Sequence, residues 1–337
     1  MRVALDAMGG DLAPREITRG AALAVRNLPD VELVLVGDEK ILHDELRREG
    51  NPERVTVFHA SQAVGMNERG AEVLRKKPDS SIVRAVELVV RKEAHAVVSA
   101  GNTGAVVAAS TLLMGLLPGV KRPGIAITFA TQSRLSTIID VGANINCKPV
   151  HLLQYGAMAG VYNRCISHAA SPTVGLLNIG QEDEKGTSLV KETHDLLKGS
   201  HLNFVGNIEG RDIHKGVCDV VVCEGFVGNV ILKATEGLAE YLLSTILKEI
   251  SRAGLDSSHP VYRSAIELKR QNDYSEYGGA PLLGVNGITI ICHGSSDAKA
   301  IFNAVRAARD FEKLHLNQDI VQELKRLPSR VASGREK

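Results

Sequence analysis

Six short apolar runs in this chain each stop at a glycine that lies beside small polar residues. The runs and their polar ends occupy 3–11, 97–104, 138–144, 176–180, 221–225 and 290–294. Short runs rich in β-branched residues are typical of parallel strands that are buried on both faces. Open α/β sheets bind ligands at the carboxyl ends of such strands. Six polar strand ends therefore predict an enzyme with a polar, anion-binding cleft.

Strands and helices are predicted to alternate along most of the chain. In the first half, strands are expected near 2–7, 31–36, 54–58 and 96–99, and 125–130 with 136–141 has the pattern of a β-hairpin. This alternation predicts an α/β fold with a mostly parallel central sheet and helices on both faces. The length of 337 residues suits a single α/β unit over 1–337. A finer division has two lobes, about 1–148 and 149–337, with the cleft between them.

The composition argues against several classes of protein. Hydrophobic residues are 44% and charged residues 23% of the chain, as in globular proteins. A net charge of +1, with 4% aromatic residues and no Trp, makes a nucleic-acid partner unexpected. The five cysteines are scattered without a CxxC pair, so neither a metal site nor a disulfide framework is indicated. Since the chain opens on a predicted strand and has no apolar run of about 18 residues, we expect a cytoplasmic location.

The strongest candidate for an anion site is the loop after the strand at 96–99. Gly101, Asn102, Thr103 and Gly104 lie between that strand and a predicted helix that begins near Ala105. Backbone N–H groups at such a helix start can bind a phosphate. The alternative is that the glycines serve only the geometry of the turn. The chain has neither the GxxxxGK[ST] nor the strand-linked GxGxxG motif, so standard nucleotide and dinucleotide sites are not expected.

Polar residues at other strand ends are further candidates. Asp140 and Asn144 lie at the end of the strand at 136–141, where they bind substrate or only stabilise a turn. Asp11 and His293 lie at two more strand ends. The adjacent Cys292 is more readily explained as a small buried side chain than as a nucleophile.

Lys185 is the one cation in a run of carboxylates. The run, from Gln181 to Thr187, follows a predicted strand that ends at Asn178 and opens a helix. Such a run is usually a solvated charge cluster. Its position past a strand end favours the other interpretation, in which Lys185 reaches into the cleft and holds an anion.

Two glycine-containing segments complete the set. Asn229 follows Gly225 and Gly228 near the start of a predicted helix, where its amide either donates to an oxyanion or caps the helix. The run 274–287, which contains Gly279, is the longest glycine-rich stretch and is a candidate flap over the site.

A long helix is predicted over 226–252. Its stretch from Leu238 to Ile250 is strongly apolar, and Lys248, Arg252 and Arg263 lie nearby. Packing in the core or in a dimer explains such a stretch. The alternative is a surface that faces a membrane or a partner.

Taken together, these motifs resemble the phosphate acyltransferase family. The resemblance is carried by 6–11, 99–105, 140–144, 180–187 and 274–287, in the family's order and over nearly the whole chain. Members of this bacterial family make acyl phosphate from acyl-[acyl-carrier-protein] and inorganic phosphate for phospholipid synthesis. The resemblance implies a fold akin to phosphotransacetylase and the isopropylmalate dehydrogenases, a homodimer, no organic cofactor and peripheral attachment to the membrane. A downstream membrane acyltransferase is the implied recipient of the product.

The resemblance also assigns roles to residues. Lys185 matches the family's lysine after the Gly-Gln-Glu-Asp run, and Asn229 matches the asparagine of its Gly-Phe-x-Gly-Asn motif. We therefore predict both as catalytic. The predicted phosphate- or substrate-binding residues are Asp11, Gly101, Asn102, Thr103, Gly104, Asp140, Asn144, Gly279 and His293, without a metal ion. The rival functions are a phosphotransacetylase that uses acyl-coenzyme A and a non-catalytic scaffold that recruits membrane lipid enzymes.

Overall fold

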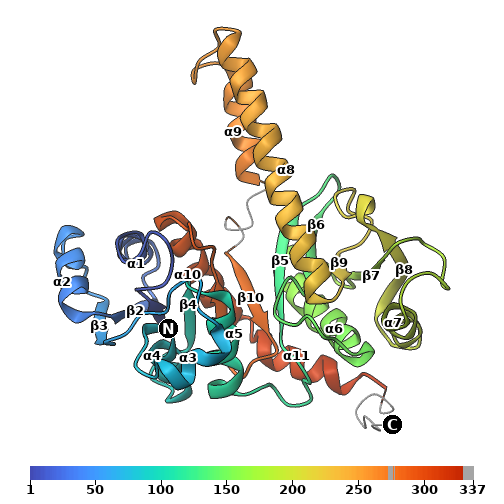
Figure 1. Cartoon of the computed structure of the whole chain (residues 1–337), viewed down its shortest axis with the longest axis horizontal. Helices are drawn as coiled ribbons and strands as arrows, with labels where there is room; N and C mark the ends of the chain where they lie inside the picture. The colour runs from blue at the N-terminus through green and yellow to red at the C-terminus, as the bar shows by residue number, and fades with distance from the viewer. Residues whose placement is uncertain (272–275, 277, 329–337) are drawn as a thin grey trace.

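The structure is a computed structural model of the 337-residue chain, and it describes residues 1–271, 276 and 278–328. One sheet of 11 strands crosses the molecule, in the order β3-β2-β1-β4-β11-β10-β5-β6-β9-β7-β8. Figure 1 shows this sheet with helices packed around it and one helical hairpin that projects outward. Most neighbouring strands run parallel; β5 and β10 are antiparallel to their neighbours. The predicted α/β class and the mostly parallel sheet are confirmed.

The N-terminal part of the chain builds one end of the sheet. Its strands are β1 (Arg2–Asp6), β2 (Glu32–Gly37), β3 (Val55–His59) and β4 (Ala96–Ser99). Its helices are α1 (Arg15–Asn27), α2 (Glu39–Arg48), α3 (Gly70–Lys76), α4 (Ser81–Val90) and α5 (Thr103–Ala109). The helix expected from Ala105 to Leu117 is α-helical only to Ala109. A π-helical turn, η1 (Ser110–Met114), follows and ends at Gly115, whose φ of 75° suits glycine.

The rest of the chain builds the other end. Its strands are β5 (Gly124–Ala130), β6 (Leu135–Ile139), β7 (Thr173–Asn178), β8 (Asn203–Glu209), β9 (Val220–Val222), β10 (Ala280–Leu283) and β11 (Ile288–Ile291). Its helices are α6 (Pro149–Ser167), α7 (Ser188–Lys198), the 3-10 turn η2 (Gly210–Asp212), α8 (Gly225–Arg252), α9 (Pro260–Gln271), α10 (Ala298–Lys313) and α11 (Leu316–Lys325). The predicted hairpin is confirmed, because β5 and β6 pair antiparallel from Ala126 and Ile139 onward.

The glycine-rich run differs from the expected flap. Ala280–Leu283 is a buried strand, β10, that pairs with β11 on one side and β5 on the other. The flap interpretation is therefore wrong for this stretch. Gly279 and Gly284 turn the chain at either end with φ of 78° and 95°, so the glycines serve turns and the apolar residues between them serve the core. Tyr274, Ser275 and Tyr277 lie outside the described residues.

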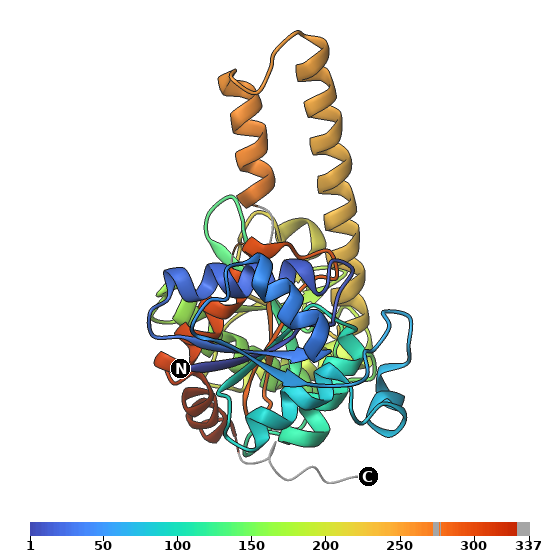
Figure 2. The same ribbon diagram turned by 90° about the vertical axis from the view of Figure 1, so that its left-hand side faces the viewer.

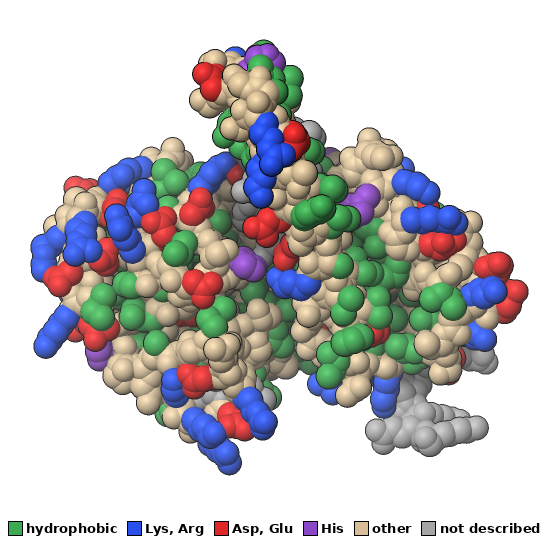
Figure 3. All heavy atoms as spheres, turned by 45° about the horizontal axis from the view of Figure 1, so that its top comes forward, with side chains coloured by type: hydrophobic (Ala, Val, Ile, Leu, Met, Phe, Trp, Pro, Cys, Tyr) green, Lys and Arg blue, Asp and Glu red, His purple; other side chains and the backbone are tan. Residues whose placement is uncertain are grey.

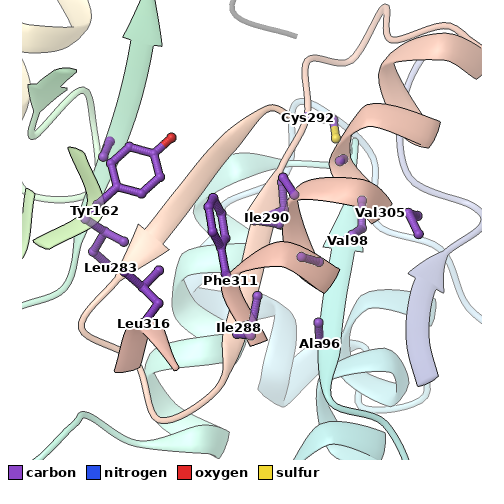
Figure 4. Close-up of a cluster of buried hydrophobic side chains, with 14 of the residues drawn as sticks. Ala96, Val98, Tyr162, Leu283, Ile288, Ile290, Cys292, Val305, Phe311 and Leu316 are labelled. Carbon is purple, nitrogen blue, oxygen red and sulfur yellow. The ribbon is translucent and has the colours of Figure 1, made fainter. Parts of the chain in front are cut away.

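The core joins the two ends of the sheet. In Figure 4, side chains of β4 and β11, such as Val98 and Ile290, belong to one buried cluster with Val305 and Phe311 of α10. The Phe311 ring meets the buried ring of Tyr162 from α6 edge-on, with centroids 5.5 Å apart. The C-terminal segment therefore connects elements from both ends through apolar burial.

The long helix projects away from this body. Figure 2 shows α8 and α9 as a hairpin that extends well beyond the sheet. Leu238 is 58% exposed and Tyr241 is 65% exposed, whereas Ile250 near the tip is buried. Packing in the chain's own core is therefore the wrong interpretation for the exposed apolar residues. No described helix is both long and apolar enough to cross a bilayer.

Candidate active site

A cavity of about 580 Å³ opens at the carboxyl ends of β1, β4 and β11. Loops after these strands supply Asp11, Gly101, Thr103, Gly104 and His293 to its wall. The first turns of α8 and the strand β5 form the opposite side. Figure 3 shows a hollow below the hairpin, between the two halves of this face. The predicted position of the site at strand ends agrees with this cavity.

The loop after β4 is held from behind by Asn102. Its side-chain oxygen accepts a hydrogen bond from the backbone N–H of Ala105 at 3.0 Å, which caps α5. Its amide nitrogen donates to the carbonyl oxygens of Met66 and Glu68, both at 2.8 Å. Asn102 therefore positions the loop, while Gly101, Thr103 and Gly104 line the cavity.

Asp6 lies beneath this loop and was not among the predicted site residues. The Ser99 hydroxyl donates to Asp6 Oδ2 at 2.6 Å and accepts from the Gly101 N–H at 3.0 Å. A Cβ on Gly9 would lie 2.4 Å from Asp6 Oδ2, so only glycine fits there. Burial raises the pKa of Asp6, although its hydrogen bond with Ser99 opposes that rise. A neutral carboxyl would not repel an anion above it. The sequence signal was an aspartate at the end of a buried strand.

Asp140 and Asn144 hold a second loop of the cavity. Asp140 is buried, and its carboxyl accepts hydrogen bonds from the backbone N–H groups of Ile125, Ala143 and Asn144. Burial raises the pKa of Asp140, and these N–H groups oppose the rise. The Asn144 amide donates to the Pro123 carbonyl and the Tyr155 hydroxyl. Neither side chain is in the cavity wall, which Val141 and Gly142 form instead.

Two residues of α8 face the cavity one turn apart. Asn229 and Lys233 both line it, and a Cβ on Gly142 would lie 3.6 Å from the Asn229 side chain. Glu224 caps α8, accepting from the N–H groups of Phe226 and Val227. The capping alternative for Asn229 is therefore wrong. Sequence reasoning missed Lys233, although its i+4 spacing from Asn229 places it on the same helix face.

Lys185 lies elsewhere in the structure. It is exposed and is not part of the wall of this cavity. Its neighbours Gly186 and Thr187 line a second cavity, of about 840 Å³, together with Val227 and Ile231 of α8. The base of α8 thus lies between the first cavity, which Asn229 lines, and the segment that carries Lys185. The carboxylate run is partly an ordinary charge cluster, because Asp183 pairs with Lys198 at 2.8 Å.

The remaining candidates surround β11. His293 lines the cavity, and its Nδ1 lies 2.7 Å from the Ser295 hydroxyl. Gly279 is buried beside Ile290 and Ile291, behind the lining residue Ala280. Cys292 also lines the cavity, but burial raises its pKa to about 12, so the thiol is not poised for attack at neutral pH. Within the described residues, no cluster of three His, Cys, Asp or Glu side chains could hold a metal ion.

Three comparisons with known proteins agree with this architecture. The fatty acid synthesis protein family matches residues 1–319. The phosphate acyltransferase of Pelotomaculum thermopropionicum is 46% identical, covering 99% of this chain and 98% of that protein. The phosphate acyltransferase of Desulfitobacterium hafniense is 47% identical, covering 97% of this chain and 98% of that protein.

Solved structures extend the likeness to the fold. A phosphotransacetylase from Streptococcus pyogenes superimposes with a TM-score of 0.61 at 16% identity, over 96% of this chain and 94% of that one. A branched-chain phosphotransacylase from Enterococcus faecalis gives a TM-score of 0.53 at 14% identity, over 91% and 98% of the two chains. The predicted likeness to the phosphotransacetylase fold is confirmed.

Proposed function

Because this chain belongs to the phosphate acyltransferase family, we propose that it transfers a long-chain acyl group from acyl-carrier protein to inorganic phosphate. The products are acyl phosphate, which feeds phospholipid synthesis, and the free carrier thiol. The observation that carries the proposal is one cavity that combines a glycine loop with Asn229 and Lys233. Such a cavity offers donors to two anions, the phosphate and the oxyanion that forms on the carbonyl.

The reaction needs no covalent enzyme intermediate. A phosphate oxygen attacks the thioester carbonyl carbon, a tetrahedral oxyanion forms, and the carbon–sulfur bond then breaks. The proton of the hydrogen phosphate passes to the departing sulfur. Backbone N–H groups of 102–104 at the start of α5 and the Lys233 amine would hold phosphate, while the Asn229 amide donates to the oxyanion.

The proposed catalytic role of Lys185 rests on the family motif alone. Its segment borders the second cavity, so acting beside Asn229 requires the amine to reach around the base of α8. Lys233 supplies a second cation at the site and is the alternative to it. Asp11 and His293 are proposed to contact substrate, whereas Asn102, Asp140, Asn144 and Gly279 act by shaping the wall.

The proposal extends to partners. The protein is proposed to form a homodimer and to bind acyl-carrier protein. It is also proposed to attach peripherally to the cytoplasmic membrane surface, near a membrane acyltransferase. The exposed apolar residues of the α8–α9 hairpin support an additional contact surface, because a monomer seldom leaves large apolar patches uncovered. No organic cofactor is needed for the reaction as written.

The decisive experiment is product detection by mass spectrometry. The protein is incubated with phosphate and either hexadecanoyl-carrier protein, hexadecanoyl-coenzyme A or acetyl-coenzyme A. Acyl phosphate formed chiefly from the carrier substrate supports the proposal. A preference for acetyl-coenzyme A would support the phosphotransacetylase rival, and no product from any donor would support the scaffold. An Asn229→Ala variant is the control, with a loss of roughly a hundredfold expected for one oxyanion donor.

A further inference from the structure

An apolar trough lies next to the polar cavity along β5. Successive residues of a strand alternate between its faces, so Ile125, Ile127 and Phe129 point to one side. Ile125 and Ile127 line the polar cavity, and Ile127 and Phe129 line the trough. Leu232 of α8 borders both spaces as well. The two spaces therefore adjoin at Ile127 and Leu232.

The trough lies between the β5–β6 hairpin and one face of α8. Ile138 of β6 and Ile213 contribute apolar side chains, while Ile231, Thr235 and Ala239 contribute from the helix. Figure 3 shows hydrophobic side chains gathered beside the base of the projecting hairpin. The wall is therefore mostly aliphatic, in contrast to the glycine- and amide-lined cavity that it joins.

One charged pair marks the junction of the trough and the cavity. The Lys233 amine, which lines the cavity, donates to Glu236 Oε2 at 2.8 Å. Glu236 lines the trough, and its Oε1 is buried without a hydrogen-bond partner among the described residues. Thr235 and His214 also line the trough, while Ala239, about one turn beyond Glu236 along α8, contributes an apolar side chain.

We propose that this trough binds the hydrocarbon chain of the acyl substrate and that Thr235 and Ala239 set the preferred chain length. The inference rests on the proposed function and adds where its substrate lies. With the thioester carbonyl beside Asn229, the first methylene groups would pass Ile127 and Leu232 into the trough. The chain would then follow α8 toward Ala239.

The trough is long enough for part of a fatty acyl chain. The seven residue-to-residue steps of helix from Leu232 to Ala239 span about 10 Å, which is about eight bonds of an extended chain at about 1.2 Å per bond. The enclosed space of about 70 Å³ holds only about two water-sized groups, so most of the chain would lie along the surface of the trough rather than inside it.

Bulky substitutions at the two helix positions test this placement. Thr235→Phe and Ala239→Phe are compared with Ala234→Phe, a control at an exposed position of α8 outside the trough wall. Turnover is measured with butyryl-, octanoyl-, dodecanoyl- and hexadecanoyl-carrier protein. Ala239→Phe should retain kcat/KM for the butyryl substrate and lose at least about tenfold for the hexadecanoyl substrate, because each methylene group kept out of an apolar site weakens binding roughly fourfold.

The position of the cut-off supplies a second criterion. Thr235 lies one turn, about 6 Å, closer to the cavity, so Thr235→Phe should discriminate against shorter chains than Ala239→Phe does. Ala234→Phe should leave the whole profile unchanged. Melting temperatures establish that each variant is folded. If Ala239→Phe does not fold, Ala239→Leu is used in its place.

The outcomes separate this inference from the proposed function. An active wild type whose chain-length profile is unchanged, or lowered equally at all lengths, by both trough variants overturns the trough alone. The same profile change in Ala234→Phe also overturns it. A wild type that makes no acyl phosphate from any carrier substrate overturns the proposed function, and the trough with it.

Discussion

At the scale of single residues, some groups of the site line the cavity and others hold the loops that surround it. Asn229 and Lys233 line the cavity, while Asp6, Asn102 and Asp140 hold its loops through buried hydrogen bonds. A carboxylate or amide beneath a loop satisfies backbone groups that would otherwise lose their hydrogen bonds. These hydrogen bonds therefore fix the shape of the loops around the cavity.

The first prediction concerns the two lysines. Because Lys185 is exposed, Lys185→Ala should keep the wild-type melting temperature and lose turnover roughly a hundredfold if the amine stabilises the transition state. Lys233→Ala should instead raise the KM for phosphate. Lys191→Ala, another exposed lysine nearby on α7, is the control. Turnover near the wild-type value in Lys185→Ala at saturating phosphate would leave Lys233 as the cation of the site.

The second prediction concerns the thiols. Burial raises the pKa of Cys292 to about 12 and holds the pKa of Cys223 well above the usual thiol range. Direct attack by phosphate needs no thiolate, so Cys292→Ala, Cys223→Ala and Cys147→Ala should each keep most of the wild-type turnover. Iodoacetamide at neutral pH should label Cys292 slowly in the folded protein. A covalent acyl-thioester trapped on any of the three would contradict direct attack.

The third prediction concerns pH. The folded protein raises the pKa of Asp6 above its unfolded value, so the folded state keeps the proton to higher pH. This contribution of Asp6 to the free energy of unfolding is fully present below the unfolded pKa. It is lost as pH rises through the folded pKa. Asparagine does not ionise, so the melting temperature of Asp6→Asn relative to wild type should increase from about pH 4 upward.

An exposed carboxylate provides the control for that experiment. Asp44→Asn, at a side chain that is 60% exposed, should show no comparable rise relative to wild type, because exposed ion pairs contribute little. A constant difference between Asp6→Asn and wild type at every pH would mean that Asp6 does not change its protonation in this range.

At the scale of elements, the α8–α9 hairpin is the feature that the body of the fold does not explain. Leu238, Leu242 and Ile246 recur every four residues along α8 and are 58%, 48% and 46% exposed. Leu243 is only half-buried by the rest of the chain. A helix with an exposed apolar face requires a partner, which is either a second copy of the chain or a lipid surface.

The fourth prediction distinguishes these partners. We expect the wild type to bind vesicles that contain phosphatidylglycerol, with Lys248 and Arg252 contacting anionic headgroups. Leu242→Glu combined with Ile246→Glu should abolish most of that binding and leave turnover in solution unchanged. Ser244→Glu combined with Ser251→Glu adds the same charge at exposed positions of α8 and serves as control. If light scattering shows that the apolar-face variant has become monomeric, the face belongs to a dimer interface.

At the scale of the whole molecule, the sheet joins segments that are far apart in sequence. β10 and β11 come from the last sixth of the chain and lie between β4 and β5. This insertion completes the cavity, because β11 contributes Ile291 and the loop after it contributes His293, opposite Asn229 of α8. The likeness to the phosphotransacetylase fold extends over nearly the whole chain. The division into two lobes at about residue 148 remains a prediction.

The sequence by itself determined the local structure and the kinds of chemistry. Apolar β-branched runs that end at glycine have a clear strand period, so most strands, the β5–β6 hairpin and the polar strand ends were predictable, whereas β10 was not. The family motifs also placed Asn229, and its helix position follows from the residues around it. These inferences need only local sequence, because backbone preference and burial pattern act over a few residues.

Only the tertiary structure decided which of the polar strand ends lie together. It placed 280–283 in the middle of the sheet, brought Lys233 into the cavity and left Lys185 on the other side of α8. It also assigned Asn102 and Asp140 to holding loops, since their hydrogen-bond partners lie in other segments. Strand order and side-chain contacts depend on which distant apolar surfaces pack together. The free energy of that packing is not encoded in any short motif.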